Sequence, residues 1–170
     1  DGYLRWFDPI SLEEQGSCQL NQVLYHLVLD PRKRRLYAAA STASLLRLNP
    51  LGDLDFAAAG DLLVYDLDDM ITTNRETIAQ PVHRWNIATF LSRIHLSDQG
   101  QELIYLAESN REIRLGRIDT ESMEPMQTQT FNLSGPAAMA VSPDQQTIYL
   151  LGGGRILLID RNKWSVKQEV

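Results

Sequence analysis

Cysteine is almost missing from this sequence, because Cys18 is the only one among 170 residues. A disulfide within the chain is therefore excluded, and a zinc site would need ligands other than a set of thiolates. No stretch approaches the roughly 18 consecutive apolar residues of a membrane-spanning helix. The chain opens on Asp1 without an initiator methionine or a basic-then-apolar leader, so we expect it to have been cut from a longer one.

Positive charge is also scarce. The formal net charge is −6 and the isoelectric point is about 5.0, which argues against a general surface for nucleic acid or anionic membranes. Hydrophobic residues make up 44% of the chain and aromatic residues 8%. This composition is typical of a folded globular protein, and the length predicts about one domain.

What the sequence does contain is a repeat. Three segments place an apolar run, a short polar turn and a second apolar run in the same order, and each carries a tyrosine after the turn. Asp, Ser and Pro in the turns predict β-hairpins, because these residues bond or preset a turning backbone. The segments are LVLDPRKRRLYAAA with Tyr37, IHLSDQGQELIYLAES with Tyr105 and MAVSPDQQTIYLLGGG with Tyr149.

A second signal is an aspartate at the end of a further apolar run, and successive copies are 58, 53 and 41 positions apart. The shortest interval matches the roughly 40–50 residues of a four-stranded propeller blade. We place the excess of the first interval in an insertion at 41–60, and a further excess in the region 75–93. The four aspartates are Asp8, Asp66, Asp119 and Asp160.

The predicted fold class is all-β, a β-propeller of four-stranded antiparallel blades. A long helix over 44–63 is excluded because Pro50, Gly52 and Gly60 interrupt it. Residues 1–20 supply only half a blade, and complete blades are expected at about 22–80, 86–131 and 134–170. About three and a half blades are too few for a ring, so we expect part of a larger propeller, completed by further blades or by another chain.

The last repeat resembles the YVTN-type propellers, members of the quinoprotein amine dehydrogenase β-chain-like superfamily. Gln145 departs from the pattern, where the family usually has glycine, as do Leu150, Leu151 and Gly152. The resemblance implies an extracytoplasmic setting, periplasmic or secreted, and a role in binding, scaffolding or framing a neighbouring redox subunit. The matching positions are Gly135, Pro136, Ser142, Pro143, Asp144, Tyr149 and Asp160.

Candidate catalytic signals are weak. Gly152, Gly153 and Gly154 lead into a predicted strand rather than a helix, which favours a tight turn over a phosphate loop. Ser97 and Ser142 lie in predicted turns and not in a nucleophile elbow, which leaves a hydrolase unsupported. Asp66, Asp68 and Asp69 lack the spacing of a calcium-binding loop. Taken together, these patterns predict no catalytic residue, no metal site and no cofactor.

The candidate binding residues lie in two groups. His26 and His95 fall on matching innermost strands and could face a central channel, either packed there or binding a metal or anion. His83, Arg84 and Trp85 are expected in a loop entering a blade, where they could contact a partner. The basic run 32–35 is expected to be a solvated hairpin tip or a contact to an acidic subunit, although a nuclear-localisation signal would have the same composition.

The sequence thus predicts a non-catalytic binding or scaffold module, whose partner is a protein or the remaining blades. The alternative is the propeller subunit of a quinone- or haem-dependent amine dehydrogenase-like enzyme with the cofactor on another chain. A WD-repeat propeller is disfavoured, because the Gly-His and Trp-Asp dipeptides of that family are missing.

Overall fold

The computed structural model describes residues 2–20, 22–41, 47–48, 54–55, 60–72, 78–87, 90–109, 112–133 and 137–170. Gly135 and Pro136, and most of the expected insertion at 41–60, lie outside these ranges. The elements are β1 (Gly2–Phe7), β2 (Glu14–Leu20), β3 (Val23–Asp30), β4 (Arg35–Ser41), β5 (Arg47–Leu48), β6 (Leu54–Asp55), β7 (Gly60–Asp66), α1 (Leu67–Thr72), β8 (His83–Asn86), β9 (Phe90–Leu96), β10 (Glu102–Glu108), β11 (Ile113–Asp119), β12 (Pro125–Phe131), β13 (Ala138–Val141), β14 (Thr147–Gly152), β15 (Arg155–Asp160) and β16 (Ser165–Glu169).

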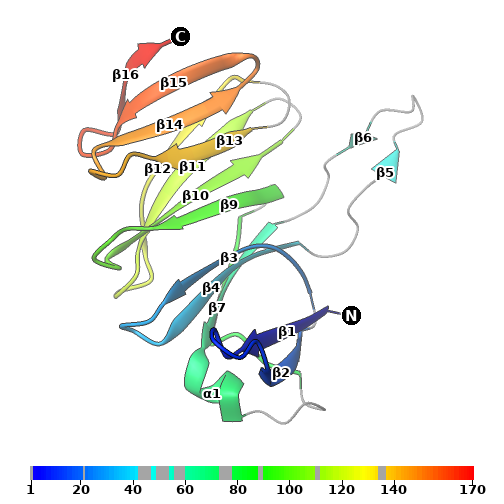
Figure 1. Cartoon of the computed structure of the whole chain (residues 1–170). Helices are drawn as coiled ribbons and strands as arrows, with labels where there is room; N and C mark the ends of the chain where they lie inside the picture. Colours follow the sequence, from blue (N-terminus) through cyan, green and yellow to red (C-terminus); the bar gives the residue numbers. More distant parts are fainter. Residues whose placement is uncertain are drawn as a thin grey trace.

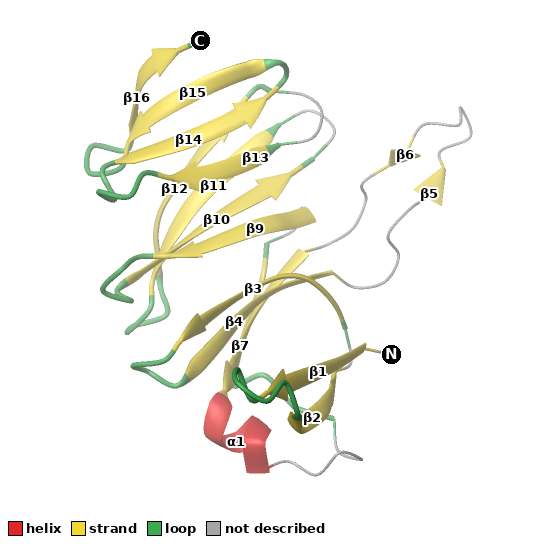
Figure 2. Ribbon diagram, in the orientation of Figure 1, coloured by secondary structure: helices red, strands yellow, loops and turns green. Residues whose placement is uncertain are grey.

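Neighbouring strands pair antiparallel in every sheet of the described ranges. Three sheets have four strands each, in the orders β3-β4-β7-β8, β9-β10-β11-β12 and β13-β14-β15-β16. Two smaller sheets pair β1 with β2 and β5 with β6. The sheets lie side by side in an arc, with the two termini at opposite ends of it (Figures 1 and 2). The first strands β3, β9 and β13 are neighbours, because β9 contacts both of the others.

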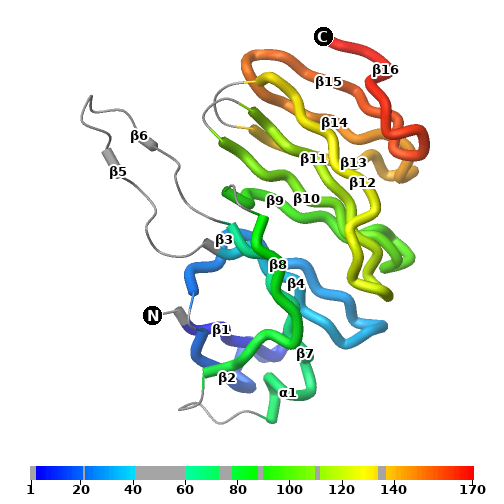
Figure 3. The backbone as a smooth tube through the Cα atoms, turned by 180° about the vertical axis from the view of Figure 1, so that it is seen from behind, coloured from blue at the N-terminus to red at the C-terminus, as the bar shows by residue number. Residues whose placement is uncertain are grey.

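The first four-stranded sheet extends further than expected. Its fourth strand, β8, pairs with β7 from His83 to Asn86, beyond the expected blade end at residue 80. The short helix α1 and a long connection separate β7 from β8 in the chain, and this hid the fourth strand from sequence reasoning. Seen from behind in Figure 3, β8 lies along the outer side of the sheet. α1 was also missed, and it is not long and apolar enough to cross a membrane.

Apolar clusters fill the spaces between neighbouring sheets. Ile104, Leu115, Ile148 and Ile159 belong to a buried cluster between the last two sheets. Tyr37, Leu62 and Tyr105 belong to the next cluster, between the first two four-stranded sheets. A third cluster, which includes Cys18, joins β1 and β2 to the far face of the β3–β8 sheet. The middle sheet is therefore covered on both of its faces.

The repeated aspartates hold tight turns. Asp8 Oδ1 accepts backbone N–H bonds from Ile10 at 2.9 Å and Ser11 at 2.7 Å. Asp119 and Asp160 make the same pair of bonds to the amides two and three residues ahead. A left-handed residue closes each of these turns, with φ of 59° at Leu12, 60° at Met123 and 52° at Trp164. A carboxylate oxygen at this position satisfies amides that the turn leaves unpaired, which explains why aspartate recurs.

The glycine run forms a turn, as predicted. Gly153 and Gly154 lie between β14 and β15 with φ of 59° and 73°. Positive φ at both central residues is typical of a two-residue hairpin, where glycine is favoured because it has no Cβ. No phosphate-binding loop is formed there.

The tyrosine alignment was wrong for one repeat. Tyr37 pairs with Val28, and Tyr149 pairs with Ala140, at the same distance from the hairpin turn. In the middle sheet the equivalent position is held by Ile104, which pairs with His95, and not by Tyr105. One residue of difference moves a side chain to the opposite face of a strand. Tyr105 therefore packs toward the preceding sheet, in the same cluster as Tyr37.

Candidate functional site

His83, Arg84 and Trp85 lie in the strand β8 and not in a loop, which corrects the sequence prediction. The His83 and Trp85 rings meet edge to face, with centroids 4.3 Å apart and an interplanar angle of 61°. Residues two apart share one face of a strand. That face is turned toward the neighbouring sheet, and Trp85 packs against the buried cluster there.

Arg84 is bound within its own sheet. Its Nη2 donates to Asp61 Oδ2 at 2.5 Å, and Asn86 Nδ2 donates to Asp61 Oδ1 at 3.2 Å. The Asp61 side chain is fully buried, so its charge needs this partner. Arg84 and Trp85 thus stabilise the outer strand. Of these three residues, His83 alone is exposed without a polar bond to another described residue.

His26 and His95 come together on the neighbouring strands β3 and β9, and Arg93 joins them. All three line a hollow of ≈ 200 Å³. Burial lowers the pKa of His26, and the positive charges of Arg93 and His95 lower it further. Sequence reasoning missed Arg93, although its spacing of two from His95 places both side chains on one face of the strand.

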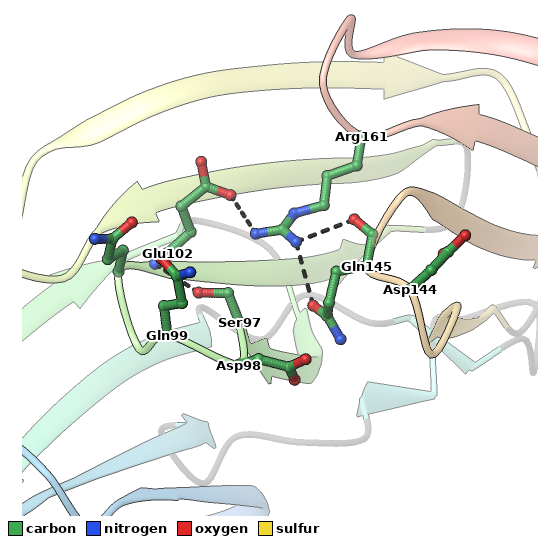
Figure 4. A pocket seen from close by; sticks show the side chains of 8 residues that line it. Ser97, Asp98, Gln99, Glu102, Asp144, Gln145 and Arg161 are labelled. Carbon is green, nitrogen blue, oxygen red and sulfur yellow. Dashed lines mark hydrogen bonds and ion pairs between the residues drawn. The ribbon is translucent and has the colours of Figure 1, made fainter.

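A second hollow, of ≈ 340 Å³, lies at the end of the sheets where the hairpin turns gather (Figure 4). Arg161 crosses it, donating to Glu102 Oε2 at 2.8 Å and to Gln145 Oε1 at 3.2 Å. Arg117 binds the other oxygen of Glu102 at 3.2 Å. These charges satisfy one another, so the hollow acts as a polar junction between two sheets.

The basic run 32–35 is a hairpin tip that is only partly solvated, since Arg32 and Arg34 are exposed and Lys33 and Arg35 are half-buried. Lys33 contacts Glu121 at 3.2 Å and Arg35 donates to the Thr120 carbonyl at 3.0 Å, both in the neighbouring sheet. Arg34 pairs with Asp68 in α1 at 2.5 Å. Three of the four basic side chains therefore join segments of this chain.

Metal-ligating side chains do not gather in the part of the chain that the structure describes, since no group of three or more His, Cys, Asp or Glu is placed to hold an ion. Asp66 accepts the amide of Asp68 at 2.8 Å and so caps α1. Cys18 is buried, and burial raises the pKa of its thiol. Trp6 packs against the cluster that contains Cys18, and Trp164, 4% exposed, belongs to the cluster between the last two sheets.

Comparison with solved structures identifies the architecture. The chain superposes on the Dos1 propeller with a TM-score of 0.66 and 12% identity, over 99% of this chain and 42% of that one. Hydrazine synthase from Kuenenia stuttgartiensis gives 0.62 and 13% identity, over 94% and 39%. The RRP9 WD40 repeats give 0.60 and 10% identity, over 88% and 39%. The fold is a partial β-propeller.

Each four-stranded sheet is thus a blade, and β3, β9 and β13 are the innermost strands of three successive blades. The chain spans about two fifths of each of these three structures. Such low identity shows the fold alone. No family model matches the sequence, and no curated protein sequence matches it at a significant level.

Proposed function

We propose that this chain is a section of a larger β-propeller that serves as a protein-binding or scaffold module and does no chemistry of its own. The observation that carries the proposal is the uncovered apolar face of the last blade. Tyr149, Leu151 and Ile156 are 41%, 45% and 40% exposed there, although they stand in the middle of a four-stranded sheet.

In the middle blade, the equivalent apolar face is covered by a neighbouring sheet. In β10, all five residues 103–107 are buried, because neighbouring sheets cover both faces of the strand. β14 has the same apolar composition, but burial alternates along it, with Ile148 and Leu150 buried and Tyr149 and Leu151 exposed. Strands that are apolar on both faces are typical of sheets covered on both sides. The face therefore fits another blade or a partner of similar apolar surface.

The opposite end of the arc has a matching uncovered face. Leu27 and Leu29 of β3 are 40% and 52% exposed, on the side of the blade where β1 and β2 pack. On this side β1 and β2 pack against β4, β7, α1 and Leu24 at the start of β3, and the shared cluster does not include Leu27 or Leu29. Two further strands next to β1 and β2 would cover Leu27 and Leu29 in a complete ring.

Assignment of the repeats to the YVTN type, with an extracytoplasmic location, belongs to the same proposal. Its support is the hairpin of the last blade, where the Ser142 hydroxyl contacts Asp144 at 2.5 Å and accepts the Thr147 amide at 2.9 Å. The redox-subunit alternative stays a prediction from sequence, because no contact among the described residues favours it.

The test is oxidative footprinting of the isolated chain and of the same segment within its natural gene product, purified in its native assembly. Tyr149 should react readily in the isolated chain and become protected in the assembly. Met126, 48% exposed on the outer strand β12, is the internal control and should react equally in both. Equal reactivity of Tyr149 in the two samples would show that nothing covers this face and would overturn the proposal.

A further inference from the structure

Three nitrogen-bearing side chains meet on the innermost strands. We propose that His26, Arg93 and His95 form a binding site for a small oxyanion, namely a phosphate or carboxylate group. The site is independent of the apolar faces discussed above, so it goes beyond the proposed binding of a protein partner.

The position of the site follows from blade packing. β3 contributes His26, and β9 contributes Arg93 and His95, while Ala138–Val141 of β13 close the hollow from the third blade. Its volume of ≈ 200 Å³ is that of a few water molecules, which suits a compact anion. The small side chains of Ala138 and Ala140 leave this space open.

The charge of the site is uncompensated. Arg93 makes no hydrogen bond or ion pair within the described ranges, and no carboxylate lines the hollow. His26 Nδ1 is buried without a hydrogen-bond partner, and the His95 Nε2 contact to Gln145 Oε1 is long, at 3.4 Å. A concentration of unpaired donors is unusual in a chain whose net charge is −6. The planar guanidinium of arginine binds carboxylate and phosphate groups through two parallel hydrogen bonds.

A metal ion is a poorer occupant. Only two imidazoles line the hollow, and a structural zinc site takes four ligands. The fixed positive charge of Arg93 would also repel a cation. The two histidine positions alone fit either a metal ion or an anion, and Arg93 favours the anion.

Anion binding should be linked to proton uptake. The groups that face His26 are Arg93 and His95 from β9, and β13 adds no titratable side chain between Ala138 and Val141. Burial and then these two positive charges hold the pKa of His26 below its usual range. A bound anion would offset the repulsion and raise that pKa, so affinity should increase as the pH falls.

The experiment is titration of the full chain with inorganic phosphate at pH 8 and pH 6, followed by NMR of the imidazole signals and by calorimetry. Phosphate should shift the signals of His26 and His95 but not those of His83, and should bind more tightly at pH 6. Acetate, tested in parallel, tells whether a carboxylate is bound as well as a phosphate.

Arg93→Gln should weaken phosphate binding on the order of tenfold or more, through loss of a charge-assisted pair of bonds. Arg155→Gln removes the same charge from an exposed side chain, 60% accessible, outside the site, and should leave the affinity unchanged. Equal losses in the two variants would mean a non-specific charge effect and would overturn the proposal. Unshifted imidazole signals in the unmodified chain would overturn it independently of how the variants fold.

Discussion

Arg161 and Glu102 join the last two blades by a hydrogen bond of 2.8 Å between Nη2 and Oε2. The two residues are 59 positions apart in the sequence, and their side chains are 13% and 19% exposed. Glu102 also accepts a bond from Arg117 within its own blade at 3.2 Å. One half-buried carboxylate therefore holds two guanidinium groups at the junction between blades.

Replacing this carboxylate should destabilise the chain. Glu102→Gln keeps the shape but removes the charge that both arginines face, so we expect the free energy of unfolding to fall by about 1–3 kcal/mol. Urea unfolding followed by circular dichroism measures the change. The control is Glu169→Gln, whose partner Arg155 is 3.0 Å away in a pair that is 60% and 52% exposed. It should cost less than about 0.5 kcal/mol, and equal losses would show that the junction adds nothing specific.

Tyr105 packs directly over Gly116, its partner across the strands β10 and β11. A Cβ at Gly116 would lie 2.2 Å from the Tyr105 ring. Gly116→Ala should therefore destabilise the chain by about 1–3 kcal/mol through overpacking. In a Tyr105→Leu background the same change should cost little, because the ring is gone and alanine suits a strand better than glycine. Thermal unfolding of the four variants gives the coupling energy, and additive effects would contradict the prediction.

Tyr105 also separates what could be predicted from the sequence from what could not. The turn residues and the alternation of apolar runs were enough to predict hairpins, blades and an incomplete ring. The register within a blade was not, because the turns before β10 and β14 have the same length and Tyr105 lies one position further along its strand than Tyr149 does. The hydrogen bond from the Glu102 amide to Ser97 Oγ, like that from Thr147 to Ser142, shows the true correspondence.

The candidate site was predicted only in part. Two histidines on matching strands were visible in the sequence, but Arg93 was not, because an arginine in a strand usually marks a solvated face. His83, Arg84 and Trp85 were misplaced for a different reason. The α1 connection made β8 read as a loop, whereas Asp61 and the blade core hold its side chains in place.

Leu12 carries a conformational cost that a single substitution should remove. It is 74% exposed and has φ of 59°, a left-handed backbone that costs an L-residue about 1–2 kcal/mol. Leu12→Gly should raise the free energy of unfolding by on the order of 0.5–1 kcal/mol, after the greater entropy of unfolded glycine is counted. Ile10→Gly, at a residue in the same turn that is 92% exposed but has no positive φ, should not stabilise. The urea midpoints of the two variants measure these changes in stability. A higher midpoint in both variants would mean that added flexibility, and not relief of the positive φ, stabilises the turn.

The aspartate turns should make stability depend on pH. Hydrogen bonds from the Ser122 amide, the Ser122 hydroxyl and the Glu121 amide hold the pKa of Asp119 below its usual range. The pKa values of Asp8, Asp144 and Asp160 are lowered by bonds of the same kind. A lowered pKa in the folded state means that this stabilisation is fully present above the ordinary carboxyl range and is lost as the pH falls through the folded values. We therefore expect the urea midpoint to fall between pH 5 and pH 3.

Asp119→Asn isolates one of these turns, since the amide oxygen still accepts backbone hydrogen bonds but does not titrate. Its urea midpoint should be lower than that of the unmodified chain at pH 7, and the gap should close as the pH falls toward 3. Asp98→Asn is the control, because it removes a carboxylate from a hairpin turn in which that carboxylate accepts no backbone amide among the described residues. A gap at Asp119 that stays constant from pH 7 to pH 3 would show that the turn is held by shape and not by the charge of its carboxylate.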